Sequence, residues 1–518
     1  MTVQIGNTVL NCPMVYASLW QASAILPSST PVGSATLTVN TGNLSSQTNI
    51  LVVGSSFGTY TVASSGTGPG IFTGTDYNVK SFSASARVGE TVILWGTGLG
   101  PINSPDDEPP QLGPQFRGVQ VFVGDVPTTV TYAGRSGCCA GLDQIAFVVP
   151  GNVTGCFVPI AVQTSNGVVS NFTSMPVNVA GGQCSSATPG IPTSILSSAL
   201  AGAPVRLGAI AIGPIPILQP AGFPVSQEFS DQVSKLLHRS VSEADARSMV
   251  NALRDRDRVI LKRLRRKYRV DEKQFHRLVG SLPRAVNIDQ QGAVAAFGTY
   301  QNLASFSPEF AANFTPSGTC TVTNSLTMTS LATSSRTRSS SLDAGSVLSF
   351  VGPLGARTMT QTGPGQYQVL LGSGFANAEV PAGVYTVSGT GGQALGAFSV
   401  SLNAASPITW TNKSSAIAVD RSMPFTFTWS GSTVPGYLLI GGSSHTPGMN
   451  TAFLCVEDAE RGTFTVPAFV LSALPPTDSS DSYFFIAPHP FSSRVSIVGL
   501  DLAYFVNGSS DYRSVLLY

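Results

Sequence analysis

The stretch ARVGETVILWGTGLGPINSP, residues 86–105, decides the fold class of this chain. In an extended strand, Val92 and Leu94 point to one face. Ile93 and Trp95 point to the other face, so the strand is apolar on both sides. The GTGLGP segment that follows turns the chain sharply and ends strand pairing. The pattern predicts a strand that is buried on one side and at least partly covered on the second.

The same kind of pattern extends over residues 1–179. Short apolar alternations are separated by turn residues at the regular spacing that is typical of antiparallel sandwiches. Examples are ATLTVN, TNILVV, VQVFVG, QIAFVVP and VPIAVQT. The first twenty residues predict two short strands around Asn11 to Pro13, with none of the features of a signal peptide.

A partial internal repeat is visible in this region. Residues 14–53 parallel residues 130–179: each runs through a Tyr-Ala strand, a loop, a strand that ends in Pro, a Val-rich strand, a Gly-Asn or Asn-Gly turn and a final strand. The first copy lacks its opening strands. We therefore expect that the native protein begins upstream of Met1.

Several motifs in order resemble a known family. They are PGIFTGTDYN (69–78), residues 86–105, FVGDVPTTVTYAG (122–134), GLDQIAFVVP (141–150) and VPIAVQTSNGVVSN (158–171). Together they resemble the IPT/TIG-type immunoglobulin-like repeat of exported proteins from soil bacteria such as Acidobacteria. The resemblance covers residues 1–180. It implies tandem immunoglobulin-like sandwiches in an exported protein, and it implies no catalytic residues.

Charge is distributed very unevenly along the chain. Only 11% of the residues are charged, whereas 42% are hydrophobic, a composition that excludes an intrinsically disordered protein. Residues 231–284 hold 15 of the 28 basic and 7 of the 27 acidic side chains, which makes this segment +8 and the remainder −7. Such a contrast predicts β modules that are interrupted by a helical insert.

The periodicity of the basic segment is helical. Ser242 with Asp245, and Asp271 with Gln274, have the spacing of a capping box, so helices are expected to begin near residues 243 and 272. Apolar residues recur every three to four positions from Met249 to Tyr268, as on one face of a helix. After Ser305 the β pattern returns. We therefore predict a mainly β protein with an inserted small α-helical segment and a C-terminal β-sandwich region. The expected order is a truncated repeat (1–62), a complete sandwich (63–180), a Gly/Pro-rich linker (181–225), a basic helical domain (226–296) and two β-sandwiches (305–405 and 406–518).

The cysteines indicate disulfides. Four of them lie close together in sequence: Cys138, Cys139, Cys156 and Cys184. They allow three pairings, and the one that joins Cys138 to Cys139 requires a strained ring, so the other two remain open. Cys320 and Cys455 are expected to form a further bridge, with Cys12 left odd. Disulfides place a protein outside the cytosol.

Motifs for enzymatic chemistry are weak. The GSSFG motif at 54–58 fits a nucleophile elbow, but a turn-rich segment follows it where a helix is required. The four histidines are scattered. A polysaccharide-active hydrolase would need paired carboxylates in a cleft, and the acid-poor β domains offer chiefly Glu457, Asp458, Glu460 and Asp501. We therefore expect no enzyme, no catalytic residues and no cofactor, with an extracellular hydrolase as the alternative.

Two charged segments remain as candidates for ligand binding. Asp106, Asp107 and Glu108 could offer oxygen ligands to Ca²⁺, although a solvated turn is the favoured interpretation. The basic run at 254–269 could bind an anionic polymer or a membrane surface, although a solvated helix face that docks on the acidic β domains is the favoured interpretation. Its candidate side chains are Arg258, Lys262, Arg263, Arg265, Arg266, Lys267 and Arg269. Nucleic acid is disfavoured because aromatic residues for base stacking are nearly absent from the run.

These patterns favour a secreted or cell-surface protein with a structural, adhesive or binding role. Its partners would be extracellular polysaccharide or protein, bound through sheet faces and loops. The uncharged stretch at 207–227 contains four prolines, which argues against a transmembrane helix.

Overall fold

The computed structural model describes most of the chain. The described residues are 1–19, 21–108, 116–185, 192, 194–195, 198, 203–215, 267, 290–300, 314–323, 338–371, 381–404, 408–431, 436–446, 449–477, 482–489, 493–507 and 510–518. The fold is mainly β, as predicted, and is built from several sheets of antiparallel and mixed strands. Among these residues no helix has both the length and the apolar character needed to cross a membrane.

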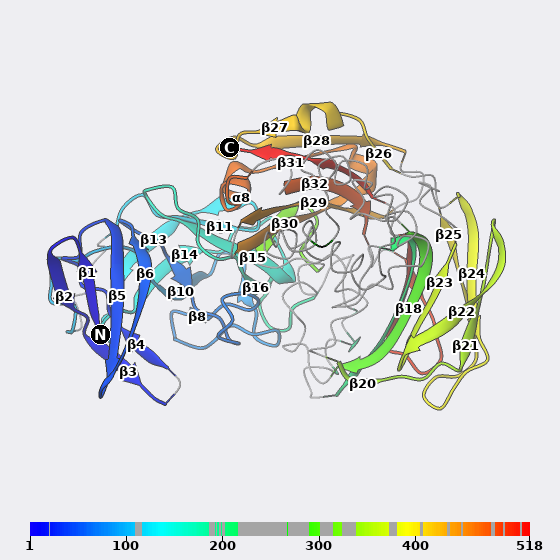
Figure 1. The fold of residues 1–518 in the computed structure, drawn as a ribbon, viewed down its shortest axis with the longest axis horizontal. Helices are drawn as coiled ribbons and strands as arrows, with labels where there is room; N and C mark the ends of the chain where they lie inside the picture. The colour runs from blue at the N-terminus through cyan, green and yellow to red at the C-terminus, as the bar shows by residue number, and fades with distance from the viewer. Residues whose placement is uncertain are drawn as a thin grey trace.

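Residues 1–53 form a small N-terminal unit (Figure 1). Its four-stranded sheet has the order β2-β1-β5-β6, and a separate hairpin pairs β3 with β4. The strands are β1 (Thr2–Ile5), β2 (Thr8–Asn11), β3 (Met14–Ala17), β4 (Ala22–Ala24), β5 (Gly33–Thr41) and β6 (Leu44–Val52). The predicted pair of strands around Asn11 to Pro13 corresponds to β2 and β3.

Residues 54–185 form the complete sandwich, which has two sheets. One has the order β13-β14-β10-β7, with β8 also paired to β10, and the other has the order β12-β11-β15-β16-β9. The first contains β7 (Gly58–Thr59), β8 (Phe72–Gly74), β10 (Thr91–Thr97), β13 (Val130–Arg135) and β14 (Asp143–Val148). The second contains β9 (Ala86–Arg87), β11 (Gln120–Val123), β12 (Val126–Thr128), β15 (Gly155–Gln163) and β16 (Thr173–Asn178).

Strand β10 occupies the position that its sequence predicts. Val92 and Leu94 are fully buried between the two sheets, and Ile93 on the opposite face is also buried. The indole of Trp95 is partly covered and donates a hydrogen bond to the hydroxyl of Thr73. The strand therefore has one core face and one covered face.

A ten-stranded sheet lies at the other end of the molecule from the N-terminal unit (Figure 1). Its order is β25-β24-β21-β22-β23-β18-β17-β34-β33, with β20 also paired to β18. Its strands are β17 (Val205–Ile215), β18 (Gln290–Tyr300), β20 (Arg338–Ser341), β21 (Val347–Gly352), β22 (Gly355–Gly363), β23 (Gln366–Leu370), β24 (Gly383–Gly389), β25 (Phe398–Ala404), β33 (Arg494–Val495) and β34 (Leu502–Asn507).

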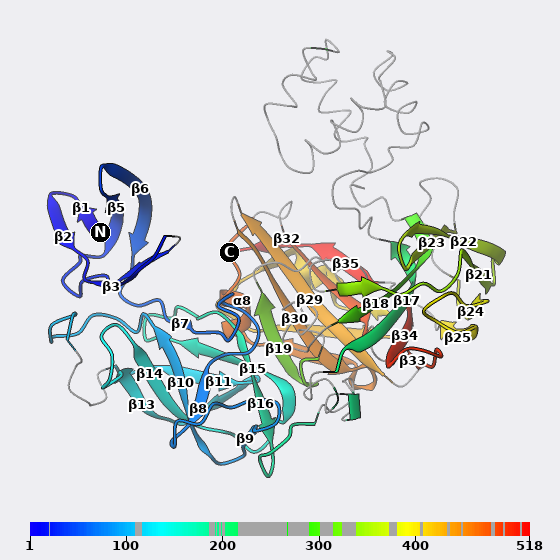
Figure 2. The ribbon, with the colours of Figure 1, turned by 90° about the horizontal axis from the view of Figure 1, so that it is seen from below.

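The C-terminal sheets pack between this sheet and the complete sandwich (Figure 2). The largest has the order β19-β30-β29-β32-β35 and contains β19 (Thr319–Thr323), β29 (Tyr437–Thr446), β30 (Met449–Asp458), β32 (Ser482–Pro488) and β35 (Asp511–Ser514). Smaller sheets combine β26 (Thr409–Trp410), β28 (Phe425–Ser430) and β31 (Thr463–Val466), and β27 (Ala418–Val419) with β36 (Leu516–Leu517). The short helices are η2 (Lys413–Ile417), η3 (Ala459–Arg461) and α8 (Ala468–Ser472).

Two strands lie where the sequence predicts other structure. β17 falls within the expected linker 181–225, and β18 begins before the expected end of the helical domain at residue 296. Small residues in both strands give the region its linker-like composition. In the folded chain these small residues allow close packing. At Gly208, for example, the ring of Phe297 lies so near that an added Cβ atom would be only 2.9 Å from its Cδ1 atom.

Strands from both sides of residue 405 pair with each other's units, so the expected division into two C-terminal sandwiches at that point is wrong. β19 precedes that point in sequence but pairs with β30, and β34 follows it but pairs in parallel with β17. At the other end, β7 lies before residue 62 and pairs with β10 of the complete sandwich. The two C-terminal units therefore exchange segments. Local alternation could not predict this exchange, because it does not encode which strands far apart in sequence pair with each other. Most of the expected basic helical domain, up to residue 289, lies outside the described residues.

Candidate binding surfaces

The N-terminal unit repeats part of the complete sandwich strand by strand. Its sheet order β2-β1-β5-β6 matches β12-β11-β15-β16, and its hairpin β3-β4 matches β13-β14. The hairpins even share a bulge, because the register shifts between Met14 and Tyr16 in one and between Val130 and Tyr132 in the other. The N-terminal unit has no counterparts of β7, β8, β9 and β10 among the described residues.

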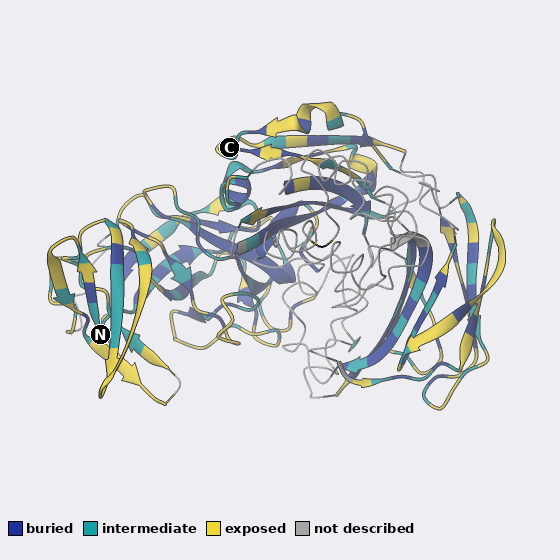
Figure 3. Ribbon diagram, viewed as in Figure 1, coloured by how far each residue is buried: buried dark blue, intermediate teal, exposed yellow. Residues whose placement is uncertain are grey.

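This difference leaves the inner face of the N-terminal sheet only partly covered. Its core has four buried apolar residues, Val3, Cys12, Ala35 and Val52, whereas the core of the complete sandwich has 18. Leu37 and Ile50 pack against the small core but keep part of their surface exposed. In Figure 3 the unit is mostly exposed or intermediate, while the strands of the complete sandwich are largely buried.

The surface of the N-terminal unit has no charged side chain and is enriched in exposed apolar side chains. Ten of the 27 large apolar side chains that are exposed among the described residues belong to its 53 residues. Leu19, Leu44 and Leu51 are 92%, 77% and 70% exposed. The first charged side chain of the sequence is Asp76. A concentration of exposed apolar surface on a folded unit marks an interaction site.

The unit is held against the complete sandwich by Asp106. Its carboxylate accepts hydrogen bonds from the backbone amide of Ser28 at 2.8 Å and from the Ser28 hydroxyl at 2.6 Å. The Ser28 hydroxyl in turn accepts a hydrogen bond from the amide of Ile102. Asp107 and Glu108 are exposed. Among the described residues no group of three or more His, Cys, Asp and Glu is arranged to hold a metal ion. The observed role of Asp106 is to join the two units.

The disulfides differ from the sequence expectation at one point. Cys138 is bonded to its neighbour Cys139, the pairing that the sequence argument set aside, and Cys156 is bonded to Cys184. The expected Cys320–Cys455 bridge is present, and Cys12 is free and buried. Excluding this pairing was therefore wrong. Both cysteines lie in a tight loop at residues 136–142, in which the amide of Ser136 donates a hydrogen bond to the carbonyl of Leu142.

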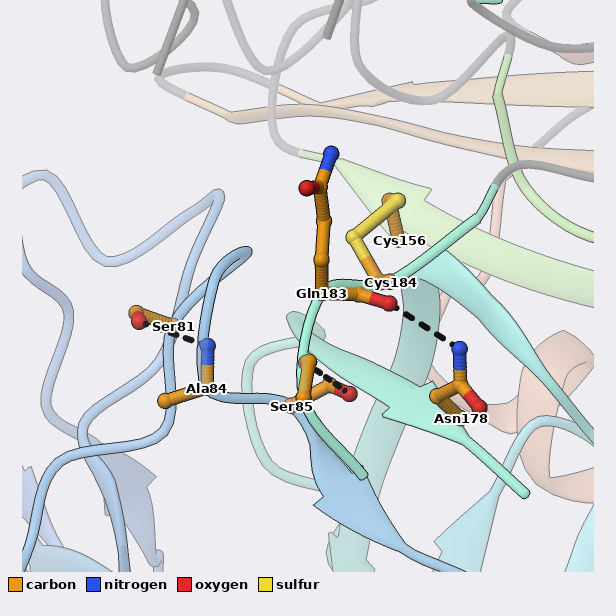
Figure 4. The surroundings of a disulfide bond; sticks show 8 residues. Ser81, Ala84, Ser85, Cys156, Asn178, Gln183 and Cys184 are labelled. Atoms are coloured by element: carbon orange, nitrogen blue, oxygen red, sulfur yellow. Dashed lines mark hydrogen bonds between the residues drawn. A yellow bond between two sulfur atoms is a disulfide. The ribbon is translucent and has the colours of Figure 1, made fainter. Parts of the chain in front are cut away.

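The Cys156–Cys184 bridge fastens the end of the complete sandwich (Figure 4). Next to it, the side-chain amide of Asn178 donates a hydrogen bond to the carbonyl of Gln183, and the hydroxyl of Ser85 donates one to the carbonyl of Gly182. Both sulfurs belong to fully buried residues, whereas Cys138 and Cys139 are exposed. The bridge therefore has a bracing role.

The junction between the complete sandwich and the C-terminal sheets is well packed. Phe469 of α8 stacks on Phe122, with ring centroids 3.8 Å apart, and lies 6.0 Å from the ring of Phe172. These residues share one buried cluster with the C-terminal core. Such continuous apolar packing couples the two parts mechanically.

A hydroxyl-lined pocket lies beside this junction. Thr67, Phe157, Phe172, Thr173, Thr315, Thr321 and Thr323 are among its lining residues. The buried hydroxyl oxygens of Thr173 and Thr323 have no hydrogen-bond partner in the protein. Since no titratable side chain lines the pocket, its chemistry is limited to hydrogen bonding, and it suits a bound water molecule.

The candidate acids of the hydrolase alternative are engaged in structural contacts. The carboxylate of Glu457 is buried and pairs with Arg461 at 2.9 Å. Asp458 caps η3 by accepting a hydrogen bond from the amide of Glu460, and Asp501 accepts one from the amide of Arg206. In the GSSFG motif the hydroxyl of Ser55 donates to the side chain of Asn166. Each of these groups thus has a structural role.

The basic run at 254–269 lies outside the described residues, except for Lys267, which is exposed. The remaining anion-binding candidates, Arg258, Lys262, Arg263, Arg265, Arg266 and Arg269, lie outside the described residues, so this anion site stays a prediction.

Sequence reasoning missed the first hairpin of the repeat. It aligned residues 14–53 with 130–179, but β1 and β2 also match β11 and β12. A signal was present, because the dipeptides Gly6-Asn7 and Gly124-Asp125 occupy the two corresponding turns. Both glycines have positive φ angles, 55° and 60°, as tight hairpin turns require.

Comparisons with known proteins gave weak similarities. No sequence profile of a known family and no curated protein matches the chain. Among solved structures, a gamma-CGTase from an alkalophilic Bacillus clarkii matches at 16% identity over 25% of this chain and 12% of that chain, with a TM-score of 0.13. A Bacteroides ovatus protein of a mixed-linkage glucan utilization locus, solved with a heptasaccharide, matches at 9% identity over 99% and 89%, with a TM-score of 0.13. An I-band fragment of titin matches at 7% identity over 84% and 95%, with a TM-score of 0.11. Similarity at this level assigns neither a family nor a function.

Proposed function

We propose that this chain is a non-catalytic binding protein that works outside the cytosol, and that the N-terminal unit is its recognition surface. The observation that carries the proposal is the concentration of exposed apolar side chains on residues 1–53, which carry no charged side chain. An exposed surface of this kind is costly for a soluble domain unless a partner covers it. The partner class that fits is a protein with an apolar, uncharged surface.

The three disulfides support an oxidising compartment. The strand order of the complete sandwich supports an immunoglobulin-like module, and the motifs at 69–171 support the IPT/TIG type. In this proposal the complete sandwich and the C-terminal sheets form the scaffold that presents the N-terminal unit.

The test uses the full chain in its native compartment. A photo-crosslinking amino acid replaces Leu44, which is 77% exposed on the N-terminal unit, and in a matched control it replaces Val498, which is 70% exposed near the ten-stranded sheet. We expect a crosslinked partner from position 44 and none from position 498. Equal crosslinking from both positions would contradict a recognition role for the N-terminal unit.

The same preparation reports the compartment. Non-reducing digestion should yield peptides linked through Cys156–Cys184 and through Cys320–Cys455. Seven free thiols in protein from its native compartment would overturn the extracytosolic part of the proposal.

A further inference from the structure

We infer that the complete sandwich carries a second binding site: the outward face of β10 and its neighbouring strands is an aromatic platform that binds a neutral polysaccharide chain of pyranose rings. The aromatic platform consists of Tyr60, Tyr77 and Trp95. This inference goes beyond the proposed function, which concerns protein recognition by residues 1–53, and it does not depend on it.

The three aromatic side chains meet on one face of the sheet. Trp95 of β10 points away from the core, in which the adjacent Leu94 is buried. Tyr60 follows β7, which pairs with β10, and its amide donates a hydrogen bond to the carbonyl of Trp95 at 3.0 Å. The ring of Tyr77 reaches Trp95 from the turn after β8. Their ring centroids lie 6.2 Å apart, and the two planes are inclined by 37°.

These rings keep accessible surface in a chain that buries most of its large aromatic side chains. Tyr77 is 65% exposed and Tyr60 is 42% exposed. Trp95 is partly exposed, whereas the other described tryptophans, Trp410 and Trp429, are buried. The face of an aromatic ring is electron-rich and attracts the weakly positive C–H groups on the face of a pyranose ring. The platform can therefore stack consecutive sugar rings.

Hydrogen bonds fix the platform before any ligand arrives. The indole nitrogen of Trp95 donates to the hydroxyl of Thr73 at 3.0 Å. The amide of Tyr77 donates to the carbonyl of Gly74 at 3.0 Å, and the amide of Gly74 donates to the carbonyl of Asn78 at 3.0 Å. Groups that are already ordered lose less conformational entropy on binding.

The backbone of Tyr77 is the second observation that points to a ligand. Its φ angle is 63°, and Ser64 is the one other described residue besides glycine with a positive φ. Asn adopts this conformation readily, whereas a bulky side chain rarely does. Strained residues of this kind cluster at ligand-binding sites, where the strain serves a function. A role in binding explains why a tyrosine occupies a turn position that suits asparagine.

Neutral polar groups surround the aromatic platform. Gln144 of β14 stands directly opposite Trp95, and its side chain is partly exposed. Thr97, two positions after Trp95 on the same face, is exposed. An amide and a hydroxyl beside a stacking surface are the groups that exchange hydrogen bonds with sugar hydroxyls.

Charge argues against an anionic ligand. The nearest charged side chains, Asp76, Lys80 and Glu90, gather around Gly74, which pairs with the core residue Val92. Lys80 forms an ion pair with Glu90, which neutralises its ammonium group. Single-stranded nucleic acid also stacks on aromatic rings, but it requires basic side chains along its backbone. The ligand that fits this face is therefore an uncharged sugar chain.

The experiment titrates cellohexaose, an uncharged chain of six pyranose rings with equatorial hydroxyls, into the full oxidised chain by isothermal calorimetry. We expect saturable binding. A thymidine hexanucleotide, which offers rings for stacking but carries phosphates, is the control ligand and should bind much more weakly.

Matched variants locate the site. Tyr77→Asn removes one ring and should weaken cellohexaose binding about tenfold. Because asparagine tolerates a positive φ, the same change should leave the midpoint of thermal unfolding unchanged or raise it. Tyr77→Phe keeps the ring and should keep the affinity. Tyr512→Asn removes a ring that is 39% exposed on β35 and should leave binding unchanged.

Three results would overturn the inference. They are absence of saturable cellohexaose binding, equal loss of binding in Tyr77→Asn and Tyr512→Asn, and hexanucleotide binding as tight as that of cellohexaose. If a photo-crosslinking amino acid at position 77 captures a protein while cellohexaose does not bind, this face belongs to a protein partner and the sugar assignment is wrong. The crosslink from position 44 tests the proposed function separately, so either can fail alone.

Discussion

Asp125 is the residue whose ionisation is most altered by its surroundings among the described acidic groups. It lies in the turn between β11 and β12, at the junction with β19, where the amide of Cys320 donates a hydrogen bond to its carboxylate at 2.9 Å. Burial raises the pKa of Asp125 to about 7; the Cys320 hydrogen bond opposes the rise, and the nearby Glu457 carboxylate adds to it. The junction thus contains a carboxyl that is protonated at mildly acidic pH.

This pKa predicts a pH-dependent stability. The folded protein keeps a proton that the unfolded chain releases near pH 4, so the free energy of unfolding should fall as pH rises from about 4 to about 7 and then level off. Each unit of difference between the pKa values of the folded and unfolded states lowers the free energy of unfolding by about 1.4 kcal/mol for a fully buried group. The effect is smaller for Asp125, because its side chain keeps some contact with solvent.

Asp125→Asn should remove this fall, because the amide stays neutral and its oxygen can still accept the Cys320 hydrogen bond. Urea unfolding at pH 5 and pH 8 measures the effect. Asp107→Asn, a change at an exposed carboxylate, serves as the control and should preserve the parent's pH dependence. The same fall in Asp125→Asn and parent would refute the assignment to Asp125.

At the scale of a single element, β29 shows how the C-terminal sheet accommodates its aromatic residues. Gly442 lies between Phe453 of β30 and Phe484 of β32 in the strand register. These two rings are fully buried and meet edge to face, with centroids 5.2 Å apart. A Cβ atom on Gly442 would lie 2.3 Å from the Phe484 ring and 2.7 Å from the Phe453 ring. The glycine provides the space that the ring pair fills.

Gly442→Ala should therefore destabilise the protein by about 1–3 kcal/mol, the usual cost of overpacking a filled core. Thermal unfolding followed by circular dichroism measures the loss. Gly54→Ala is the matched control, because a Cβ atom there meets no atom within 4 Å. Equal stability of the two variants would show that the sheet can move apart at Gly442.

At the scale of the whole molecule, the chain is a set of β units fastened at their junctions. Asp106 fastens the N-terminal unit, and stacked phenylalanines fasten the complete sandwich to the C-terminal sheets. The ten-stranded sheet joins the same assembly through segments that cross between units, such as β34 beside β17. Because the sandwich junction is apolar and continuous with the C-terminal core, the two parts should unfold together.

Phe469→Ala should uncouple them. Removing a buried phenyl ring costs about 3–5 kcal/mol, and here the loss falls on the junction. Scanning calorimetry should show the complete sandwich and the C-terminal sheets unfolding in separate transitions. Phe398→Ala, which removes a ring from the ten-stranded sheet, should lower stability without separating these two transitions. A single shifted transition in Phe469→Ala would contradict the coupling.

The sequence by itself determined the mainly β class and, for strands with clear alternation such as β10, which faces they bury. Alternation in residues 91–97 was sufficient to assign both faces of β10, because side-chain direction in a strand depends only on neighbouring residues. The repeat between residues 14–53 and 130–179 also needed no coordinates. The pairing of Cys320 with Cys455, the two cysteines left after the cluster of four and the odd Cys12, is the one that the structure has.

Only the tertiary structure decided which strands meet. β17, with its small residues, reads as a linker until Phe297 and Leu500 are seen to pack against Gly208. The bond between Cys138 and Cys139, which the sequence argument set aside, was likewise decided by the folded chain. The physical reason is that alternation records whether a side chain is covered, whereas the identity of the covering strand depends on contacts between distant parts of the chain.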